Sequence, residues 1–301
     1  RGLRKGMRAT VMALALTLLP TACAGERHEL PPGVLVVTEG EQTASFIRNF
    51  NPLLEVGDVR WQTLRGMYEP LEIYDQLNGQ WVPWLATGHR WEQAAKVLVF
   101  DIREGVKWSD GREMSADDVL FTFELIKKFP ALDLRGVWKH LESVTVEGNS
   151  LRCVFKAPHV PGLGSIAQQP IVPRHIWSEV EDPVSWGNPN PVATGPFTEV
   201  LKFETQVYEI GKNPHYWMPG KPAFDAMRFP AFAANDQATL ALVSGEVDWA
   251  GYFVPAIDRT FVGKDPEHHD YWFPLIEGTV FLYPNTARAP YDQVGVRKGI
   301  S

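Results

Sequence analysis

Within about thirty residues, one stretch of this sequence changes its hydrophobic period from that of a strand to that of a helix. Residues 97–103 (VLVFDIR) place Leu98, Phe100 and Ile102 on one face and Val97, Val99 and Asp101 on the other, which predicts a half-buried strand. Two turn signals follow, and Ser115 with Asp118 then predicts a capped helix that ends at Pro130. The apolar stripe of this helix is predicted to contain Val119, Leu120, Phe123 and Ile126. Such a chain folds by packing helices on strands.

The letters of this stretch carry more information than its periodicity. REGVKWSDGREMSADDVLFTFELI, residues 103–126, resembles the signature of the family 5 solute-binding proteins, the extracytoplasmic receptors of peptide-type ABC importers. Further segments also resemble motifs of that family: YEPL, WVPWLA, IVPRHIW, NPNPVATGPF and NPHYW. The sequence departs from it at Ala193, where glycine is usual, and at Gly299, where alanine is usual. The resemblance extends over residues 34–301.

The resemblance implies an α/β fold of the periplasmic-binding-protein type, with two lobes and an extra inserted domain (the cluster C type). We expect the second lobe to be missing, because full members of the family are considerably longer. The expected divisions are a signal peptide at 1–23, a discontinuous first lobe at 30–70 and 190–270, a satellite domain at 71–189, and a truncated second lobe beginning at 271–301.

Several local patterns predict individual elements. Residues 34–37 (VLVV) form a continuous apolar run, which favours a strand buried on both faces. Residues 61–71 read as a helix. Hairpin turns are predicted at 78–79 and at 147–150. A helix is predicted within 236–248, with Asp236 as its cap, Leu240 and Val243 packed, and Gly245 in the left-handed conformation at its end.

The N-terminal residues have the composition of an export signal. Four cations lie before residue 10, and the apolar run VMALALTLL is too short to remain as a membrane-spanning helix. Cys23 follows small residues and resembles the lipid-bearing cysteine of a bacterial lipoprotein, although Pro20 stands where leucine is usual. We expect an exported, lipid-anchored protein; the alternative is ordinary cleavage near Ala24. The other cysteine, Cys153, is predicted to be a small buried strand residue, so no disulfide framework is available.

The formal net charge of −7 argues against nucleic acid or an anionic membrane surface as the partner. The resemblance implies instead a small ligand, an oligosaccharide or a peptide, and the permease subunits of an ABC transporter. We expect a monomer without a cofactor. A candidate ligand site is predicted from aromatic and amide side chains that are flanked by polar residues: Asn51, Trp61, Trp249, Tyr252, Phe253, Tyr283 and Asn285. Trp272 is a further aromatic residue of this kind.

Two further patterns are typical of enzymes, and neither predicts a complete active site. GLGSIA at 162–167 has the form G-x-G-x-x-A, but the prolines around it favour a loop over a dinucleotide site. Glu39 with Glu41, Asp117 with Asp118, and Glu179 with Glu181 are the carboxylate pairs that a glycoside hydrolase would need. The Asp117 and Asp118 pair is already explained as the start of a helix.

The histidines give little support for a metal site. His268 and His269 are adjacent, which strains joint coordination, so a solvated loop is the better interpretation. Metal complexes remain possible ligands. We therefore predict no enzymatic activity and no protein-bound metal. The predicted function is the delivery of an oligosaccharide or oligopeptide to a permease. The alternatives are a secreted carbohydrate-active hydrolase and a signalling or adhesion lipoprotein with the same fold.

Overall fold

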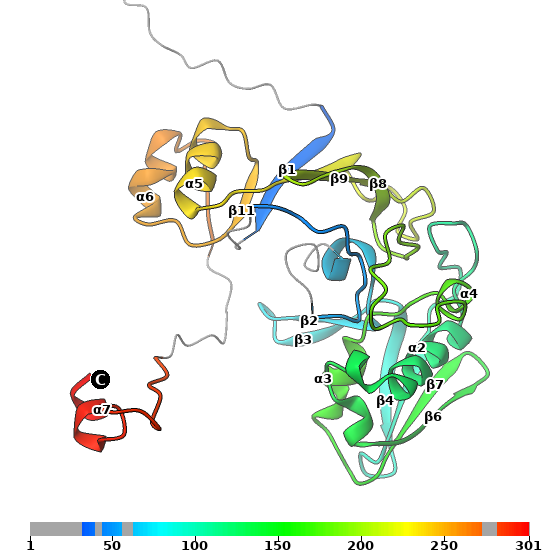
Figure 1. Ribbon diagram of the computed structural model, residues 1–301. Coiled ribbons are helices and arrows are strands. Elements are labelled where there is room, and N and C mark those ends of the chain that lie inside the picture. Colours follow the sequence, from blue (N-terminus) through cyan, green and yellow to red (C-terminus); the bar gives the residue numbers. More distant parts are fainter. Residues whose placement is uncertain (1–31, 40–43, 56–62, 273–281, 301) are drawn as a thin grey trace, which may run out of the picture.

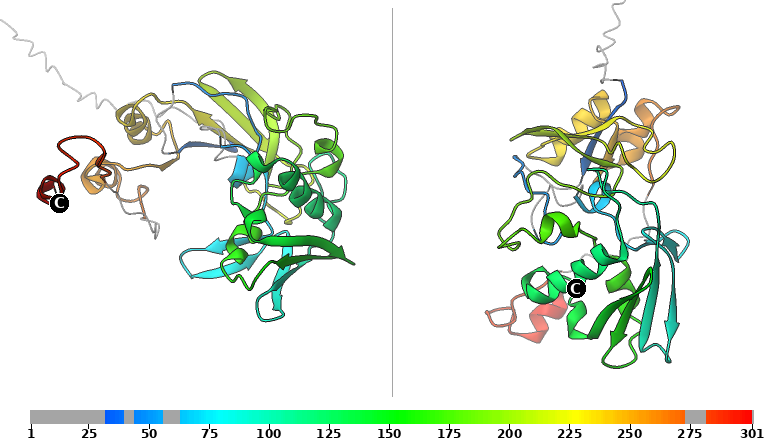
Figure 2. Two further views of the ribbon diagram at one scale, coloured as in Figure 1. Left: turned by 60° about the horizontal axis from the view of Figure 1, so that its bottom comes forward. Right: turned by 90° about the vertical axis from the view of Figure 1, so that its right-hand side faces the viewer.

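A computed structural model of the chain describes residues 32–39, 44–55, 63–272 and 282–300. In this part of the chain two main β-sheets lie one below the other in Figure 1, and most of the helices pack beside them. The architecture is a mixed α/β fold, as the sequence predicted. Figure 2 shows the same two sheets from two other sides.

The upper sheet has five strands in the order β11-β1-β10-β9-β8. Its strands are β1 (Val34–Glu39), β8 (Phe197–Glu204), β9 (Val207–Lys212), β10 (Ala226–Pro230) and β11 (Trp249–Gly251). β1 runs parallel to both β10 and β11, whereas β8 and β9 pair antiparallel. Val36 belongs to a small core that includes residues of α5 (Asn235–Ser244), and Val37 belongs to the main core. The prediction of a strand buried on both faces is therefore confirmed.

The lower sheet has four antiparallel strands in the order β4-β5-β7-β6. Its strands are β4 (Ala86–Glu92), β5 (Val97–Ile102), β6 (Leu141–Glu147) and β7 (Ser150–Phe155). All of them lie in sequence between β1 and β8, so this sheet is inserted into the upper one. The division of the chain into two lobes and a satellite domain stays a prediction.

β5 is more buried than its sequence pattern predicted. Val97 and Val99, expected on an open face, are only 1% and 2% exposed, and Asp101 is the exposed residue of the strand. The reason is position, since β5 lies between β4 and β7. Cys153 on β7 is fully buried, which confirms that prediction.

The helix after β5 begins and ends close to where its sequence signals lie. α2 (Ala116–Lys128) has Ser115 as its N-cap, and the Asp118 carboxylate accepts a hydrogen bond of 2.9 Å from the Ser115 backbone N–H. Its other oxygen accepts one of 2.9 Å from the N–H of Arg174. The predicted apolar stripe is buried, and only its Leu120 stays partly exposed. Asp118 therefore both caps α2 and attaches the segment at Arg174 to it.

The remaining elements are short. Two strands form a hairpin, β2 (Glu72–Asp75) with β3 (Gln80–Pro83). The helical segments are η1 (Thr63–Met67), η2 (Pro130–Leu132), η3 (Val137–Lys139), α3 (Gly162–Ala167), α4 (Arg174–Trp177), α6 (Ile257–Thr260), η4 (Val262–Lys264) and α7 (Val294–Ile300). The turns predicted at 78–79 and 147–150 are the turns of the two hairpins β2–β3 and β6–β7.

Three local predictions need correction. The GLGSIA segment forms the short helix α3 rather than a loop; Gly162 there packs so closely that an added Cβ would lie 2.5 Å from the Phe155 ring. In the described part of 61–71 the helical portion is the single turn η1. α5 begins at Asn235 rather than after an Asp236 cap, and Leu240 is 69% exposed because Ala238, Ala241 and Leu242 form its buried face. Gly245 ends α5 with φ of 80°, as predicted.

One continuous main core joins the two sheets. It contains Tyr208, Ile210 and Phe229 from the upper sheet together with Leu98, Phe100 and Leu151 from the lower one. Because a shared apolar core resists relative movement of the parts that form it, we treat this body as a single platform for the site described next.

Candidate ligand-binding site

The candidate site lies at the edge of the upper sheet where β1 and β11 end. The two strands are parallel, with Val37 beside Trp249 and Thr38 beside Ala250, so their carboxyl ends reach the same edge. The Asp248 carboxylate accepts a hydrogen bond of 2.8 Å from the N–H of Val36, which fixes this register across 212 residues. In open α/β sheets, ligands bind outside the carboxyl ends of the strands.

Trp249 is the best-placed of the predicted ligand residues. Its indole is partly buried against the main core and lies 6.2 Å, between ring centroids, from the indole of Trp272. It also lies over Gly251, where an added Cβ would be 2.8 Å from a ring carbon. Trp272 is 62% exposed. Gly251 thus leaves room for the Trp249 ring, and the two indoles form an aromatic surface that solvent can reach.

Tyr252 and Phe253 follow β11 and point in different directions. The Tyr252 hydroxyl lies 3.3 Å from the Thr239 hydroxyl of α5, and burial raises the pKa of this phenol. The ring packs against the small core. Phe253 is 73% exposed. Phe253 is therefore open to a ligand, whereas the hydroxyl of Tyr252 is already hydrogen-bonded to α5.

The side chain of Asn51 is buried and hydrogen-bonded within the protein. Its side chain is 1% exposed, and its amide nitrogen donates to the carbonyls of Pro183 and Trp186 at 3.0 and 2.8 Å. Its amide oxygen accepts from the N–H of Leu53 at 2.9 Å. These bonds attach the segment after β1 to residues 183–186. A ligand role for Asn51 stays a prediction, and the geometry gives the residue a bracing role.

In the described residues, neither Tyr283 nor Asn285 contacts Trp249 through a ring contact or a side-chain hydrogen bond. Tyr283 is 83% exposed, and the Asn285 side chain accepts a local hydrogen bond of 3.1 Å from the N–H of Ala287. Trp61 and Cys23 lie outside the described residues. Trp272 belongs with the predicted ligand residues. Its sequence context is like theirs, but only the fold shows that it lies beside Trp249.

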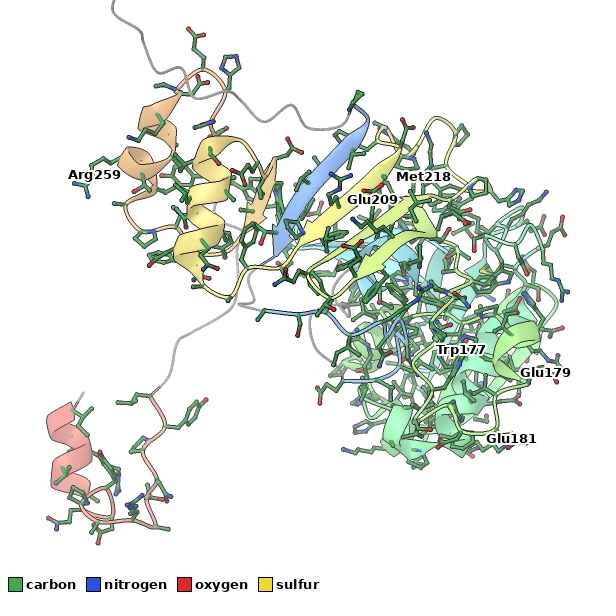
Figure 3. The ribbon with its side chains drawn as sticks, turned by 45° about the horizontal axis from the view of Figure 1, so that its top comes forward. Trp177, Glu179, Glu181, Glu209, Met218 and Arg259 are labelled. Atoms are coloured by element: carbon green, nitrogen blue, oxygen red, sulfur yellow. The ribbon has the colours of Figure 1, made fainter. Side chains whose placement is uncertain are left out.

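The carboxylate pairs do not form a hydrolytic site in the described residues. Asp118 is occupied at the start of α2. Glu179 and Glu181 are both exposed in the segment after α4, where Figure 3 labels them. Glu41 lies outside the described residues, as does the side chain of Glu39. A hydrolase with a pair of facing carboxylates is therefore not favoured.

A buried carboxyl that sequence reasoning missed lies at Glu69. It is 5% exposed and accepts hydrogen bonds from the indoles of Trp84 (2.7 Å) and Trp217 (3.0 Å) and from the hydroxyl of Tyr216 (3.2 Å). Burial raises the pKa of Glu69, against the effect of these donors. With its oxygens occupied inside the protein, Glu69 ties segments together and is out of reach of a substrate.

The described residues hold no group of three or more His, Cys, Asp and Glu side chains that could bind a metal ion. His268 bonds to Asp265 at 2.9 Å, and the ring of His269 stacks on Phe261 at 4.0 Å. The two rings therefore have separate partners. In the same part of the chain, none of the helices combines the length and the apolar character needed to cross a bilayer.

Comparisons with known proteins agree with this architecture. Residues 80–301 match the family model described as "Bacterial extracellular solute-binding proteins, family 5 Middle". A putative ABC transporter peptide-binding protein of Brucella ovis is 27% identical over 286 residues, which cover 92% of this chain and 52% of that protein. A peptidoglycan-binding protein of Agrobacterium fabrum is 29% identical over 278 residues, covering 82% and 43%.

Among solved structures, a periplasmic oligopeptide-binding protein of an ABC transporter from Thermotoga maritima, crystallised with mannohexaose bound, superposes with a TM-score of 0.68. It is 30% identical, and the match covers 77% of this chain and 43% of that one. This chain spans about half the length of the curated relatives it matches.

Proposed function

Because the chain belongs to the bacterial extracellular solute-binding proteins of family 5, we propose that it is the receptor of an ABC importer and that it binds a neutral oligosaccharide. In this proposal it carries out no covalent chemistry. It captures the ligand outside the cytoplasm and presents it to the permease subunits in the membrane. Two lobes would close on the ligand by hinge motion, and the permease would recognise the closed form.

The observation that carries the sugar assignment is the aromatic surface of Trp249 and Trp272 at the carboxyl end of parallel strands. An indole face packs well against the apolar face of a sugar ring, and such contacts contribute on the order of 1 kcal/mol beyond simple burial. A peptide receptor needs charged partners for the termini of its ligand or an exposed strand that pairs with its backbone. Directly after β11, Phe253 adds a further exposed aromatic side chain.

The relatives support the class of ligand without deciding it. One solved relative holds mannohexaose although its name refers to oligopeptides. Two curated relatives are named for peptides and for peptidoglycan. An oligopeptide is therefore the competing ligand, and the experiment has to offer both classes.

The test is a binding panel on the purified full-length protein, in which both lobes of the proposed receptor are present. Isothermal titration calorimetry is run with neutral oligosaccharides of two to six units and with peptides of two to nine residues. We expect saturable binding of at least one oligosaccharide and none of the peptides. Binding of peptides with no response to any oligosaccharide would overturn the sugar assignment and leave the receptor assignment standing.

Trp249→Ala is the first site variant. It removes the partly buried indole of the aromatic pair, so we expect affinity for the sugar to fall about tenfold, which corresponds to about 1.4 kcal/mol. Tyr74→Ala is the matched control, because Tyr74 is a 42% exposed aromatic residue on the β2–β3 hairpin. Equal losses in both variants, or none in Trp249→Ala, would place the ligand elsewhere. Circular dichroism and thermal melting check that both variants are folded.

A further inference from the structure

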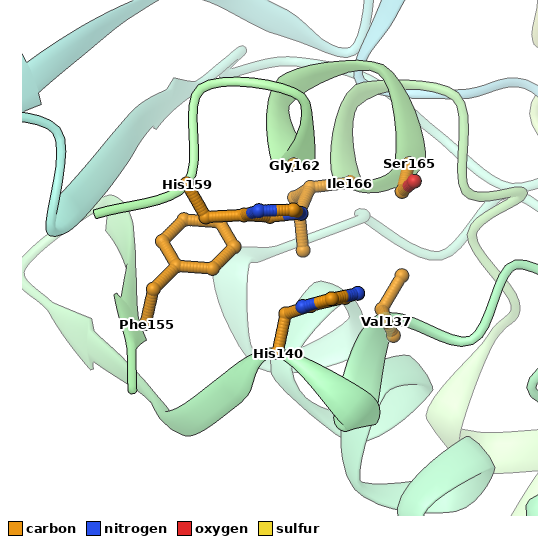
Figure 4. Close-up of a pocket in the computed structure, with 7 residues that line it drawn as sticks. All are labelled: Val137, His140, Phe155, His159, Gly162, Ser165 and Ile166. Atoms are coloured by element: carbon orange, nitrogen blue, oxygen red, sulfur yellow. The ribbon is translucent and has the colours of Figure 1, made fainter. Parts of the chain in front are cut away.

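Two histidines stack on one another at the end of the four-stranded sheet, far in sequence from the aromatic pair. The rings of His140 and His159 have centroids 4.1 Å apart and planes within 12° of parallel. They lie in a small hollow, open to solvent, whose walls are Val137, His140, Phe155, His159, Gly162, Ser165 and Ile166. Figure 4 shows one ring above the other, with Phe155 at one end of the pair and Val137 and Ser165 at the other.

The surroundings of the pair are basic. No carboxylate lines the hollow. Residues 127–165 contain six Lys and Arg against three Asp and Glu, in a chain whose net charge is −7. Three ammonium groups surround the adjoining turn η3: Lys127 lies over the Trp138 ring at 4.2 Å, Lys156 contacts the carbonyl of Lys139 at 3.0 Å, and Lys139 itself packs on Gly136. In the described residues none of the three has a carboxylate within 4 Å.

The charged and titratable neighbours of the pair are few. η3 contributes Lys139, β7 is followed by Lys156, and α3 has no titratable residue. β6 carries Glu142, which pairs at 3.9 Å with Lys96. Burial, and then the charge of His140, lower the pKa of His159. Two stacked imidazoles that both take up a proton repel each other, and nothing on these elements neutralises the pair.

We propose that this hollow is a second binding site, separate from the aromatic one, for a tetrahedral oxyanion such as a phosphate or sulfate group. Such an anion places acceptor oxygens against the ring N–H groups of both imidazoles and against the hydroxyl of Ser165. It also supplies the negative charge that the hollow lacks. Charge-assisted hydrogen bonds of this kind are about twice as strong as neutral ones. Phosphate groups occur both free in solution and on lipid headgroups, and both sources present the same chemistry.

The proposal has a pH signature. Because the pKa of His159 is lowered, its imidazole is neutral at pH 8 and takes up a proton only as the pH falls. The bound anion should favour the protonated rings, and its affinity should rise as the pH falls from 8 to 5.5. Sulfate is the sharper probe, because its own charge is constant over this range.

The experiment measures sulfate binding to the purified protein by calorimetry at pH 5.5 and pH 8.0, at fixed chloride, with the histidine C2–H signals followed by NMR. We expect affinity about tenfold higher at pH 5.5, with shifts in two histidine signals that are absent in His140→Gln and His159→Gln. His268→Gln is the control, because His268 is exposed and bonded to Asp265 elsewhere. Binding unchanged in both His140→Gln and His159→Gln would overturn the proposal.

A second pair of variants tests the hollow with both histidines kept. Ser165→Asp adds a carboxylate that repels the anion, and Ser165→Asn has nearly the same size without the charge. We expect Ser165→Asp to abolish sulfate binding and Ser165→Asn to retain most of it. Sedimentation with phosphatidylglycerol vesicles, against phosphatidylcholine vesicles, then separates the sources. Vesicle binding that depends on His140 and His159 assigns a lipid headgroup, and sulfate binding alone assigns a free anion. A protein that binds neither probe would refute the site.

Discussion

At the scale of single residues, Glu69 is a buried carboxyl that accepts three side-chain hydrogen bonds. Its three hydrogen-bond donors come from Trp84, which precedes β4, and from Tyr216 and Trp217, which follow β9. The guanidinium of Arg103 lies over the Trp217 ring at 4.7 Å and donates to the carbonyl of Trp84 at 2.6 Å. This cluster therefore joins the strands of one sheet to a loop of the other through polar contacts inside an apolar core.

We expect Glu69→Gln to change how stability depends on pH. Burial raises the pKa of Glu69 above its ordinary value of 4.5, so the folded state holds the proton more tightly than the unfolded state. The stabilisation is full below pH 4.5 and is lost as the pH rises through the raised pKa. The free energy of unfolding of the wild type, measured with urea from pH 4 to 8, should therefore fall relative to that of Glu69→Gln as the pH increases.

The control for this prediction is Glu124→Gln, since Glu124 is an exposed carboxyl on α2. Its difference from the wild type should be nearly constant with pH. A Glu69→Gln difference that stays flat, or that grows in favour of the wild type, would contradict the raised pKa.

Asn51→Ala should destabilise the protein by about 1–3 kcal/mol, because it leaves two buried carbonyls and one N–H without their partner. Chemical denaturation measures the loss. Asn190→Ala removes an exposed amide that bonds to Arg48 and should cost no more than about 0.5 kcal/mol. If Asn51→Ala leaves stability unchanged but weakens ligand binding, the residue belongs to the ligand site after all.

At the scale of elements, Asp118 both caps α2 and connects it to α4. One carboxylate oxygen satisfies the N–H of Ser115, and the other satisfies the N–H of Arg174 at the start of α4. Asp117 precedes it in the same first turn and is exposed. Both charges suit the helix dipole, so a comparison of the two positions isolates the hydrogen bonds.

We predict that Asp118→Ala costs about 1–3 kcal/mol of stability, the sum of a lost cap and a lost contact between helices. Asp117→Ala should cost less than about 1 kcal/mol, because it loses only the interaction with the dipole. Thermal unfolding of the two variants beside the wild type is sufficient. Similar melting temperatures for both variants would mean that the bonds of Asp118 contribute nothing beyond its charge.

At the scale of the whole molecule, the two sheets share one core although one sheet is inserted in the sequence of the other. The aromatic pair and the histidine pair belong to different sheets. Trp249 is on β11 of the five-stranded sheet, and His140 and His159 flank β6 and β7 of the four-stranded one. The two proposed sites can therefore be altered independently.

Attachment to the membrane also belongs to this scale. We predict that Cys23→Ala moves the protein from the membrane fraction to the soluble fraction of a bacterial host, because the thioether to the lipid cannot form. Cys153→Ala, which removes a buried thiol on β7, should leave the distribution unchanged. Immunoblots of the two fractions provide the measurement. An unchanged distribution in Cys23→Ala would favour ordinary signal cleavage.

The sequence alone determined the features whose signals are short-range. The cap, stripe and end of α2, the turns of both hairpins, and the left-handed glycine at the end of α5 each depend on residues a few positions apart. The family followed from phrases of the same kind. Local chemistry of this sort acts before any tertiary contact exists, so it can be read from the sequence.

Only the tertiary structure decided which side chains are exposed to a ligand. The sequence around Asn51 predicts an accessible polar loop, but in the structure its side chain is hydrogen-bonded to residues 183–186. The sequence around Trp272 resembles that of the other loop aromatics, and only the fold shows that its ring lies beside that of Trp249. The edge that carries Trp249 depends on a bond between Val36 and Asp248, 212 residues apart. Burial is a property of the whole packed chain, because each face is covered by whatever distant segment the topology brings to it.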